Sequence, residues 1–212
     1  MAYLTGRREF WGLHLAVSPA VLIPRPETET LVQAALERLA TGVRLAVLDL
    51  GTGSGAIALA IARERPQASV LATDKSEAAL EVARANAARL GIGNVEFIGS
   101  DWYLGLPKRC FDAIVSNPPY IAPEDPHLRD GDLRFEPRMA LTPERDGLAA
   151  LRIIILGARD RMEPGGVLVV EHGYDQSTAV QGLFATAGFE GLQPFRDLAG
   201  IARVVAGRSP RA

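Results

Sequence analysis

Short apolar runs alternate with helical patterns along most of this chain. Compact runs at 44–50, 69–74, 94–101 and 111–116 are typical of buried parallel strands. Apolar residues at helical spacing predict helices over 24–40, 56–65 and 76–91 between or before these runs. Ser76 suits the start of the third helix and Gly91 its end. The sequence therefore predicts a series of alternating strands and helices.

The C-terminal third continues this pattern. We expect a helix over 146–162, a turn at 164–166, a strand at 167–172, a helix at 176–187 and strands at 189–196 and 201–206. Alternation of this kind indicates an α/β fold, with a mostly parallel sheet covered by helices on both faces. The final strand pair predicts an antiparallel edge strand. Residues 1–23 are interpreted as an extended or hairpin appendage to a domain over 24–212.

Composition is that of an ordinary globular domain. The chain has 212 residues, 48% apolar and 23% charged, with no apolar stretch near the roughly 20 residues of a membrane span and no secretory signal pattern. Its single cysteine, Cys110, favours a reducing compartment, so we expect a cytoplasmic protein. A net charge of −2 gives no overall positive field for nucleic acid, and the three scattered histidines predict no metal site.

A glycine-rich turn joins the first parallel strand to its helix. The turn consists of Gly51, Thr52, Gly53, Ser54 and Gly55. Glycines allow a tight turn and close approach of a ligand to the backbone. The spacing G-x-G-x-G differs from the G-x-G-x-x-G of dinucleotide sites, and Asp49 would repel a pyrophosphate. A carboxylate there suits, through a water, the ammonium of S-adenosylmethionine, which is the favoured cofactor.

Polar residues also end the next two strands. Asp74 is placed to accept hydrogen bonds from both ribose hydroxyls, Asp101 from the adenine amino group, and Trp102 to cover a ring face. Structural interpretations stay open for each feature taken alone: the glycine turn as a plain connection, Asp74 as a helix cap, and Trp102 as a core residue. Together, these features at one edge of the sheet predict a nucleoside-type cofactor site.

The fourth strand ends in a rigid polar turn, Asn117-Pro118-Pro119-Tyr120. The prolines fix the backbone and donate no hydrogen bonds, so the side-chain oxygen of Asn117 and the main-chain oxygen of Pro118 can accept from the two hydrogens of a planar –NH₂ group. Such acceptors make an amide nitrogen more electron-rich and stabilise the positive charge that develops on it. Asn117, Pro118 and Tyr120 are the candidate catalytic residues. All four residues are candidates for substrate binding, with Tyr120 stacking on the planar group; the alternative is a plain tight turn.

Other polar positions have modest interpretations. Glu27 and Glu29 suit the first turn of a helix, and Glu171 and His172 suit structural hydrogen bonds at a strand end. The segment 121–143 is long for a compact domain, as lids and binding loops are, although its arginines also fit a solvated face.

Several motifs together resemble a known family. The glycine turn and the Asn117–Tyr120 turn are similar to those of class I S-adenosylmethionine-dependent N-methyltransferases. Further segments resemble the release-factor glutamine methyltransferases, the HemK/PrmC family. They are REFW at 8–11, LIPRPETE at 22–29, SDW at 100–102, RFEP at 134–137, AL at 140–141 and VEHG at 170–173.

The resemblance implies a Rossmann-like fold with a mostly parallel seven-stranded sheet and an antiparallel edge strand. It also implies methyl transfer from S-adenosylmethionine, with S-adenosylhomocysteine as product, to the glutamine of a Gly-Gly-Gln loop in peptide-chain release factors, a step linked to translation termination. In this scheme residues 51–55 and Asp74 hold the cofactor, Trp102 lies beside its adenine, and Asn117 bridges cofactor and substrate. The family carries an N-terminal helical domain, so we expect residues 24–212 to be the methyltransferase catalytic domain without it.

Alternatives to this function differ in chemistry. A DNA or RNA amino-group N-methyltransferase would use the same turn but would need a basic groove. A non-catalytic nucleoside-binding module would bind cofactor without turnover, and a nicotinamide-dependent oxidoreductase conflicts with the glycine spacing. We expect a protein substrate, no membrane partner and no direct nucleic-acid binding.

Overall fold

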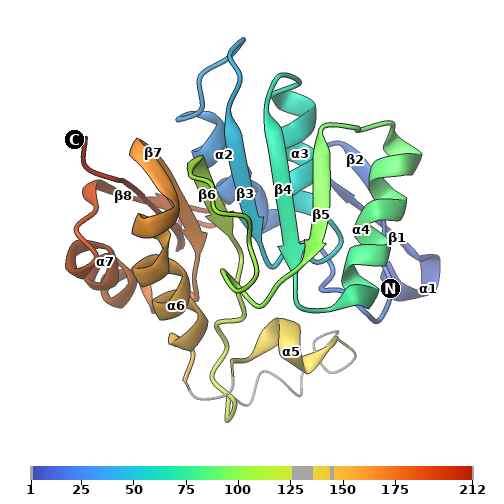
Figure 1. The fold of residues 1–212 in the computed structure, drawn as a ribbon. Coiled ribbons are helices and arrows are strands. Elements are labelled where there is room, and N and C mark those ends of the chain that lie inside the picture. The colour runs from blue at the N-terminus through green and yellow to red at the C-terminus, as the bar shows by residue number, and fades with distance from the viewer. Residues whose placement is uncertain (1, 126–135, 144–145, 212) are drawn as a thin grey trace.

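A seven-stranded sheet forms the centre of the molecule. The computed structural model describes residues 2–125, 136–143 and 146–211. In these residues the sheet order is β5-β4-β3-β6-β7-β9-β8. The strands are β3 (Ala46–Leu50), β4 (Ser69–Asp74), β5 (Val95–Gly99), β6 (Phe111–Ser116), β7 (Met162–Glu171), β8 (Glu190–Arg196) and β9 (Ala202–Arg208). The five strands β3 to β7 run parallel, so their carboxyl ends meet at one edge (Figure 1).

Helices cover both faces of this sheet, as the alternating pattern predicts. One face is covered by α2 (Glu29–Leu36), which follows a 3-10 turn at Pro26–Thr28, and by α3 (Ala56–Glu64) and α4 (Glu77–Leu90). The other carries α6 (Ala149–Ala158) and α7 (Ser177–Thr186). Two short helices, α1 (Ala2–Thr5) and α5 (Arg138–Leu141), lie outside these layers (Figure 1).

Alternating strand residues divide the core into two layers. In β3, Val47 packs with α2 and α3, whereas Leu48 and Leu50 pack with α6 and α7. All three are fully buried, as expected for a central parallel strand that is covered on both faces. The polar exception is Asp49, which lies on the α3 side of the same strand.

The caps predicted for α4 are confirmed. The Ser76 side chain accepts a hydrogen bond from the Ala79 amide, and Gly91 ends the helix in the left-handed conformation, φ 67°. These contacts satisfy backbone groups that helix ends otherwise leave unpaired. Strands 69–74 and 111–116 also have the predicted bounds.

Three details of the C-terminal third differ from the sequence-based expectations. The antiparallel strand is present, but it is β9, one position inside the edge that β8 occupies. The turn expected at 164–166 lies inside β7, where pairing with β6 skips from Met162 to Val167, and this bulge accommodates Pro164, which lacks an amide hydrogen. Helix α6 begins at Ala149 because Asp146 turns back to accept from the Leu148 amide.

An N-terminal hairpin packs onto the helical face beside α3 and α4. Its strands β1 (Arg7–Phe10) and β2 (Leu13–Ala16) pair antiparallel, and Phe10, Leu13 and Leu15 are buried in the same core layer as α3. Strands are therefore present at 7–10 and 13–16 of the segment interpreted as an extended or hairpin appendage. The division of the chain at residue 23 stays a prediction.

Asn86 of α4 ties this hairpin to the glycine turn. Its side-chain oxygen accepts from the Ala16 amide at 2.7 Å, and its nitrogen donates to the carbonyl oxygens of Ala16 and Ser54 at 3.0 and 2.9 Å. The residue is fully buried. Loss of this side chain would leave buried backbone groups of two segments without partners.

We expect Asn86→Ala to lower the free energy of unfolding by about 2 kcal/mol, because it removes the hydrogen bonds of a fully buried amide to the backbone of Ala16 and Ser54. Urea unfolding followed by circular dichroism measures this change. The control is Glu81→Ala, an exposed change on the same helix with an expected effect within about 0.5 kcal/mol. Equal stability of the two variants would contradict the role given to Asn86.

Candidate functional site

The pairing of β3 with β6 brings the glycine turn and the Asn117–Tyr120 turn together. Leu50 lies opposite Ser116 in the parallel register, and the Ser116 hydroxyl donates to the Leu50 carbonyl at 2.7 Å. The next residues along the two strands are Gly51 and Asn117. Chain order reverses between these neighbouring strands, which is where open α/β sheets bind ligands.

Left-handed backbone shapes the glycine turn. Gly51, Gly53 and Gly55 have φ angles of 74°, 54° and 84°, which side chains rarely tolerate. A Cβ atom on Gly55 would approach Leu59 and Ala83 at 3.1 and 3.2 Å, whereas one on Gly53 would meet nothing within 4 Å. The turn therefore packs tightly against the helices at its end and opens to solvent in the middle.

Asp49 lies underneath the turn. Its side chain is fully buried, and Oδ2 accepts from the Thr52 hydroxyl at 2.7 Å, while Oδ1 has no partner among the described residues. Burial raises the pKa of Asp49 to about 7, and the hydrogen bond from Thr52 opposes this shift. The carboxyl group thus supports the turn from below, and its second oxygen is buried without a partner among the described residues.

Asp74 fastens the open middle of the turn. Oδ2 accepts from the Gly53 amide and Oδ1 from the Ser76 amide, both at 2.9 Å. Burial raises its pKa, and the backbone hydrogen bonds work against this shift. The two predictions for Asp74, as a cap of the next helix and as an acceptor for ribose hydroxyls, are therefore compatible.

Asp101 and Trp102 follow β5 at the same edge. Asp101 forms an ion pair with Lys75 at 2.8 Å, so a salt-bridge partner already engages this partly exposed carboxylate. The Trp102 ring lies beside the glycine turn, 3.6 Å from where a Cβ on Gly51 would be. It also packs partly against the α6 side of the core, which makes it both a core residue and a wall of the site.

The Asn117–Tyr120 turn presents oxygen acceptors. The Asn117 amide nitrogen donates to the Thr28 hydroxyl at 3.1 Å. Among the described residues, no donor hydrogen-bonds to Asn117 Oδ1 or to the main-chain oxygen of Pro118. The carbonyl of Tyr120 is different, because it accepts from Gln176 at 3.0 Å. These two oxygens therefore have no hydrogen-bond donor among the described residues, and their role as acceptors for a substrate amide stays a prediction.

Tyr120 is anchored by Glu171. Its hydroxyl donates to Glu171 Oε1 at 3.1 Å, and burial raises the Tyr120 pKa, so the hydroxyl stays protonated. Glu171 is itself buried at the end of β7. The neighbouring His172 makes the structural hydrogen bond expected of it, with Nδ1 2.7 Å from the Gly173 carbonyl, and burial lowers its pKa.

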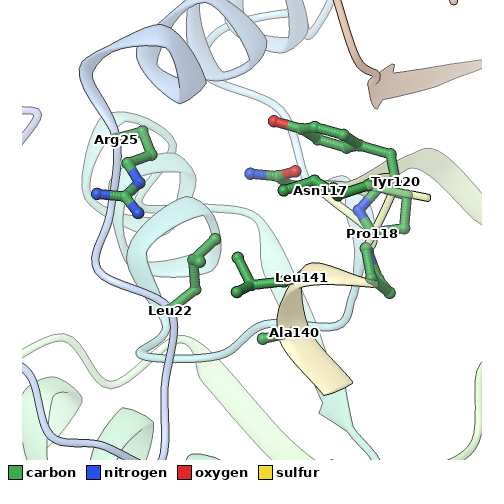
Figure 2. A pocket seen from close by; sticks show the side chains of 9 residues that line it. Leu22, Arg25, Asn117, Pro118, Tyr120, Ala140 and Leu141 are labelled. Atoms are coloured by element: carbon green, nitrogen blue, oxygen red, sulfur yellow. The ribbon is translucent and has the colours of Figure 1, made fainter. Parts of the chain in front are cut away.

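A small hollow of about 60 Å³, partly open to solvent, lies against this turn (Figure 2). Leu22 and Leu141 point toward one another across it, and Asn117 and Tyr120 lie on its polar side (Figure 2). The remaining lining comes from two other segments. The stretch before α2 provides Leu22 and Arg25, and α5 provides Ala140 and Leu141. An apolar slot with polar groups at one end suits a short side chain with a planar polar tip.

One ion pair and one hydrogen bond hold the stretch before α2 and the first residue of this helix. Arg25 pairs with the buried carboxylate of Glu136 at 2.6 Å, which joins this stretch to the segment leading into α5. Glu29 accepts from the Trp11 amide at 2.8 Å, so it secures the hairpin tip as well as the helix start. Residues 126–135 of the expected lid segment, including Arg134 and Phe135, lie outside the described residues.

Sequence reasoning missed several residues of this site. Thr28, Leu22 and Leu141 are quoted within family-like segments without a site role, and Glu171 has only a structural one. The sequence feature that could have indicated a site role is Glu171 itself. It is an acid at the carboxyl end of a buried strand, and open α/β sheets bind ligands at the carboxyl ends of their strands. The contact between Thr28 and Asn117 spans 89 residues, which no local pattern encodes.

The described part of the chain carries neither a metal-ligand cluster nor a helix that could span a membrane. No group of three or more histidine, cysteine, aspartate or glutamate side chains in it is arranged to hold a metal ion. No helix within 2–125, 136–143 and 146–211 is both long and apolar enough to span a bilayer.

Comparison with known proteins gives one consistent family. The family model "Methyltransferase small domain" matches residues 28–129. A release factor glutamine methyltransferase of Xylella fastidiosa (strain Temecula1) is 57% identical over 99% of this chain and 76% of the relative. The enzyme of that name from Escherichia coli (strain K12) is 48% identical over 98% of this chain and 75% of the relative.

Solved structures agree with these matches. A release factor-specific protein-(glutamine-N5) methyltransferase from Alicyclobacillus acidocaldarius is 32% identical, with a TM-score of 0.53 over 92% of this chain and 99% of that chain. A methyltransferase from Pyrococcus furiosus has a TM-score of 0.70 at 20% identity, over 94% of this chain and 90% of that chain, which supports the fold.

The buried Asp49 carboxyl predicts a pH-dependent stability. An unfolded aspartate titrates near pH 4, whereas Asp49 in the folded chain titrates at about 7. Between these values the folded state binds more protons, so Asp49 makes the free energy of unfolding fall as pH rises. We expect Asp49→Asn to flatten this fall by at most about 1.4 kcal/mol per pH unit, measured by urea unfolding across the range. The exposed control Asp160→Asn leaves the slope unchanged, and the same result for Asp49→Asn would contradict the assignment.

Proposed function

Because this chain belongs to the release factor glutamine methyltransferase family, we propose that its Asn117–Tyr120 turn holds the side-chain amide of a release-factor glutamine for N-methylation. The observation that carries this proposal is the pair of available acceptors, Asn117 Oδ1 and the Pro118 carbonyl, beside an apolar slot. A carboxamide –NH₂ has two hydrogens and needs two acceptors.

Both acceptors would act on the reactivity of the amide nitrogen. Its lone pair is delocalised into the adjacent carbonyl, and fixed acceptors on both hydrogens return electron density to it and stabilise the charge that develops during attack. Holding the nitrogen in line with the methyl group contributes further, since good positioning is worth roughly 7–11 kcal/mol of barrier lowering. The double proline keeps both acceptors rigid.

The glycine turn would hold S-adenosylmethionine. The open side of Gly53, the unpartnered Oδ1 of Asp49 and the half-buried Asp74 fit a nucleoside with an amino-acid tail. Asp74 would accept from ribose hydroxyls with the lone pairs that the turn amides leave, and Trp102 would lie beside the adenine. When bound, this cofactor supplies a methyl group on a positively charged sulfur atom.

Apolar walls would exclude water and select the substrate. Leu22 and Leu141 narrow the slot (Figure 2). A flexible side chain whose neighbouring residues are small would therefore enter more easily than one whose neighbours carry large side chains. A DNA or RNA amino group is the less favoured substrate, because the net charge is −2 and the relatives are named for release factors. A release-factor partner and the single cysteine are in keeping with a cytoplasmic reaction.

Methyl transfer to a purified release factor tests the proposal. We expect one methyl group per release factor, no transfer to a variant whose loop glutamine is replaced by alanine, and none to duplex DNA. Radiolabelled cofactor and mass spectrometry of the loop peptide measure these outcomes. Transfer to DNA with an unmodified release factor would reject the proposal.

Asn117→Ala removes one of the two acceptors. We expect methyl transfer to fall at least about a hundredfold, since loss of a fixed donor or acceptor at a reacting centre costs that much. Cofactor affinity should change less than about threefold, measured by calorimetry on the same preparation. Undiminished turnover would exclude Asn117 from the reaction.

Asp74→Ala addresses the cofactor instead. Hydrogen bonds to a charged group contribute about 1.5–3 kcal/mol each, so we expect the dissociation constant for S-adenosylhomocysteine to rise ten- to hundredfold. Calorimetric titration measures the constant. Asp160→Ala, an exposed change far along the chain, is the control and should leave it unchanged. An unaltered constant in Asp74→Ala would refute the ribose assignment.

A further inference from the structure

One side chain, Gln176, hydrogen-bonds to both ends of the chain segment that carries α5. Gln176 lies at the start of α7, and its Nε2 donates to the carbonyl oxygens of Tyr120 at 3.0 Å and of Gly147 at 3.2 Å. Residues 121–146 lie between these two carbonyls in the sequence, and α5 is part of them. The chain therefore leaves the Asn117–Tyr120 turn and comes back to it at a single amide group.

A third hydrogen bond fixes the orientation of this amide. Gln176 Oε1 accepts from the backbone amide of Gly173 at 2.9 Å. A backbone N–H only donates and a carbonyl oxygen only accepts, so Oε1 must face Gly173 and the –NH₂ must face the two carbonyls. The two hydrogens of the –NH₂ group then serve one carbonyl each. We call these three hydrogen bonds the Gln176 junction.

Two glycines leave the space that the Gln176 junction needs. A Cβ atom on Gly147 would lie 2.5 Å from the Tyr120 carbonyl oxygen and 2.6 Å from Gln176 Nε2. A Cβ atom on Gly173 would lie 3.1 Å from Gln176 Oε1. Because packed interiors do not tolerate approaches as short as 2.5 Å, a side chain at position 147 would push this part of the chain away from the turn.

The placement of α5 depends on the same region. The Ile121 amide donates to the Leu141 carbonyl at 3.0 Å, so the last residue of α5 is bonded to the first residue after the turn. Leu141 and Ala140 line the hollow that Asn117 also borders (Figure 2). The apolar wall of the slot is therefore carried by a segment whose two ends are both bonded to Gln176.

We propose that Gln176 is a positioning residue that joins Tyr120 to Gly147 and thereby holds α5 as a wall of the substrate slot. This inference rests on the proposed function, because it assigns the slot to a substrate side chain.

Loss of the Gln176 junction should act on substrate binding more than on the reacting atoms. The proposed acceptors, Asn117 Oδ1 and the Pro118 carbonyl, follow directly from β6 in a turn that two prolines keep rigid. Helix α5, in contrast, has only four residues, too few to be stable without tertiary contacts. We therefore expect a change in the KM for the protein substrate rather than in kcat.

Steady-state methyl transfer to a release factor tests the proposal. Gln176→Glu keeps the shape of the side chain and the acceptor for Gly173, but it has no hydrogen for either carbonyl. We expect its KM for the release factor to rise about tenfold, the effect of about one net hydrogen bond, with kcat changed less than about threefold. The dissociation constant of S-adenosylhomocysteine should stay unchanged, because the glycine turn is not part of the Gln176 junction.

A rescue variant and a matched control accompany this change. Gln176→Lys again supplies N–H donors for the two carbonyls and should recover most of the wild-type KM. Gln181→Glu is the same substitution further along α7, where Gln181 donates to Ser177 of that helix, and it should leave KM and kcat unchanged. A wild-type KM in Gln176→Glu, an equally raised KM in Gln176→Lys, or a loss confined to kcat would overturn the proposal.

Hydrogen–deuterium exchange without substrate separates this inference from the proposed function. The Ile121 amide, which donates to Leu141, should exchange faster in Gln176→Glu than in the wild type or in Gln181→Glu. Unchanged exchange would overturn the inference even if the chain methylates release factors. Faster exchange in a chain whose wild type methylates no release factor would support the Gln176 junction and contradict the proposed function.

Discussion

The parallel pairing of β3 with β6 is the constraint on which the site depends. Hydrogen bonds along these strands, and the Ser116 hydroxyl on the Leu50 carbonyl, place the glycine turn and the double-proline turn in fixed register. If the two strands were not neighbours in the sheet, the two turns would not border the same site. The apolar side chains on both faces of β3 keep this pair at the centre of the core, where backbone movement is most costly.

Two buried carboxyl groups support the two turns from below. Asp49 supports the glycine turn through Thr52, and Glu171 supports the Asn117–Tyr120 turn through Tyr120. Burial raises the pKa of both to about 7, and hydrogen bonds from hydroxyl groups offset part of the desolvation cost. The oxygens proposed to accept from the substrate, Asn117 Oδ1 and the Pro118 carbonyl, are neutral, so both carboxyl groups would support the site without pairing with the amide.

Much of the fold was predictable because local rules govern it. Strands 69–74 and 111–116 have the expected bounds, and the caps of α4 follow from Ser76 and Gly91. Errors arose where tertiary pairing overrides local preference, as in the Pro164 bulge inside β7 and the position of β9 within the sheet. At the site, motif spacing pointed to both turns. The role of Thr28 could not be read from spacing, because its partner Asn117 is reached only by closing 89 residues of chain.

Hydrogen bonds of the Asn86 side chain connect the hairpin to the glycine turn. This one amide group bonds to the backbone of Ala16 in β2 and to the carbonyl oxygen of Ser54. A displacement of the hairpin would therefore be transmitted through the Asn86 side chain to the backbone of the glycine turn, which is proposed to bind the nucleoside. Contacts that fix the position of β1 and β2 therefore also limit movement of the glycine turn, which is far from the hairpin in sequence.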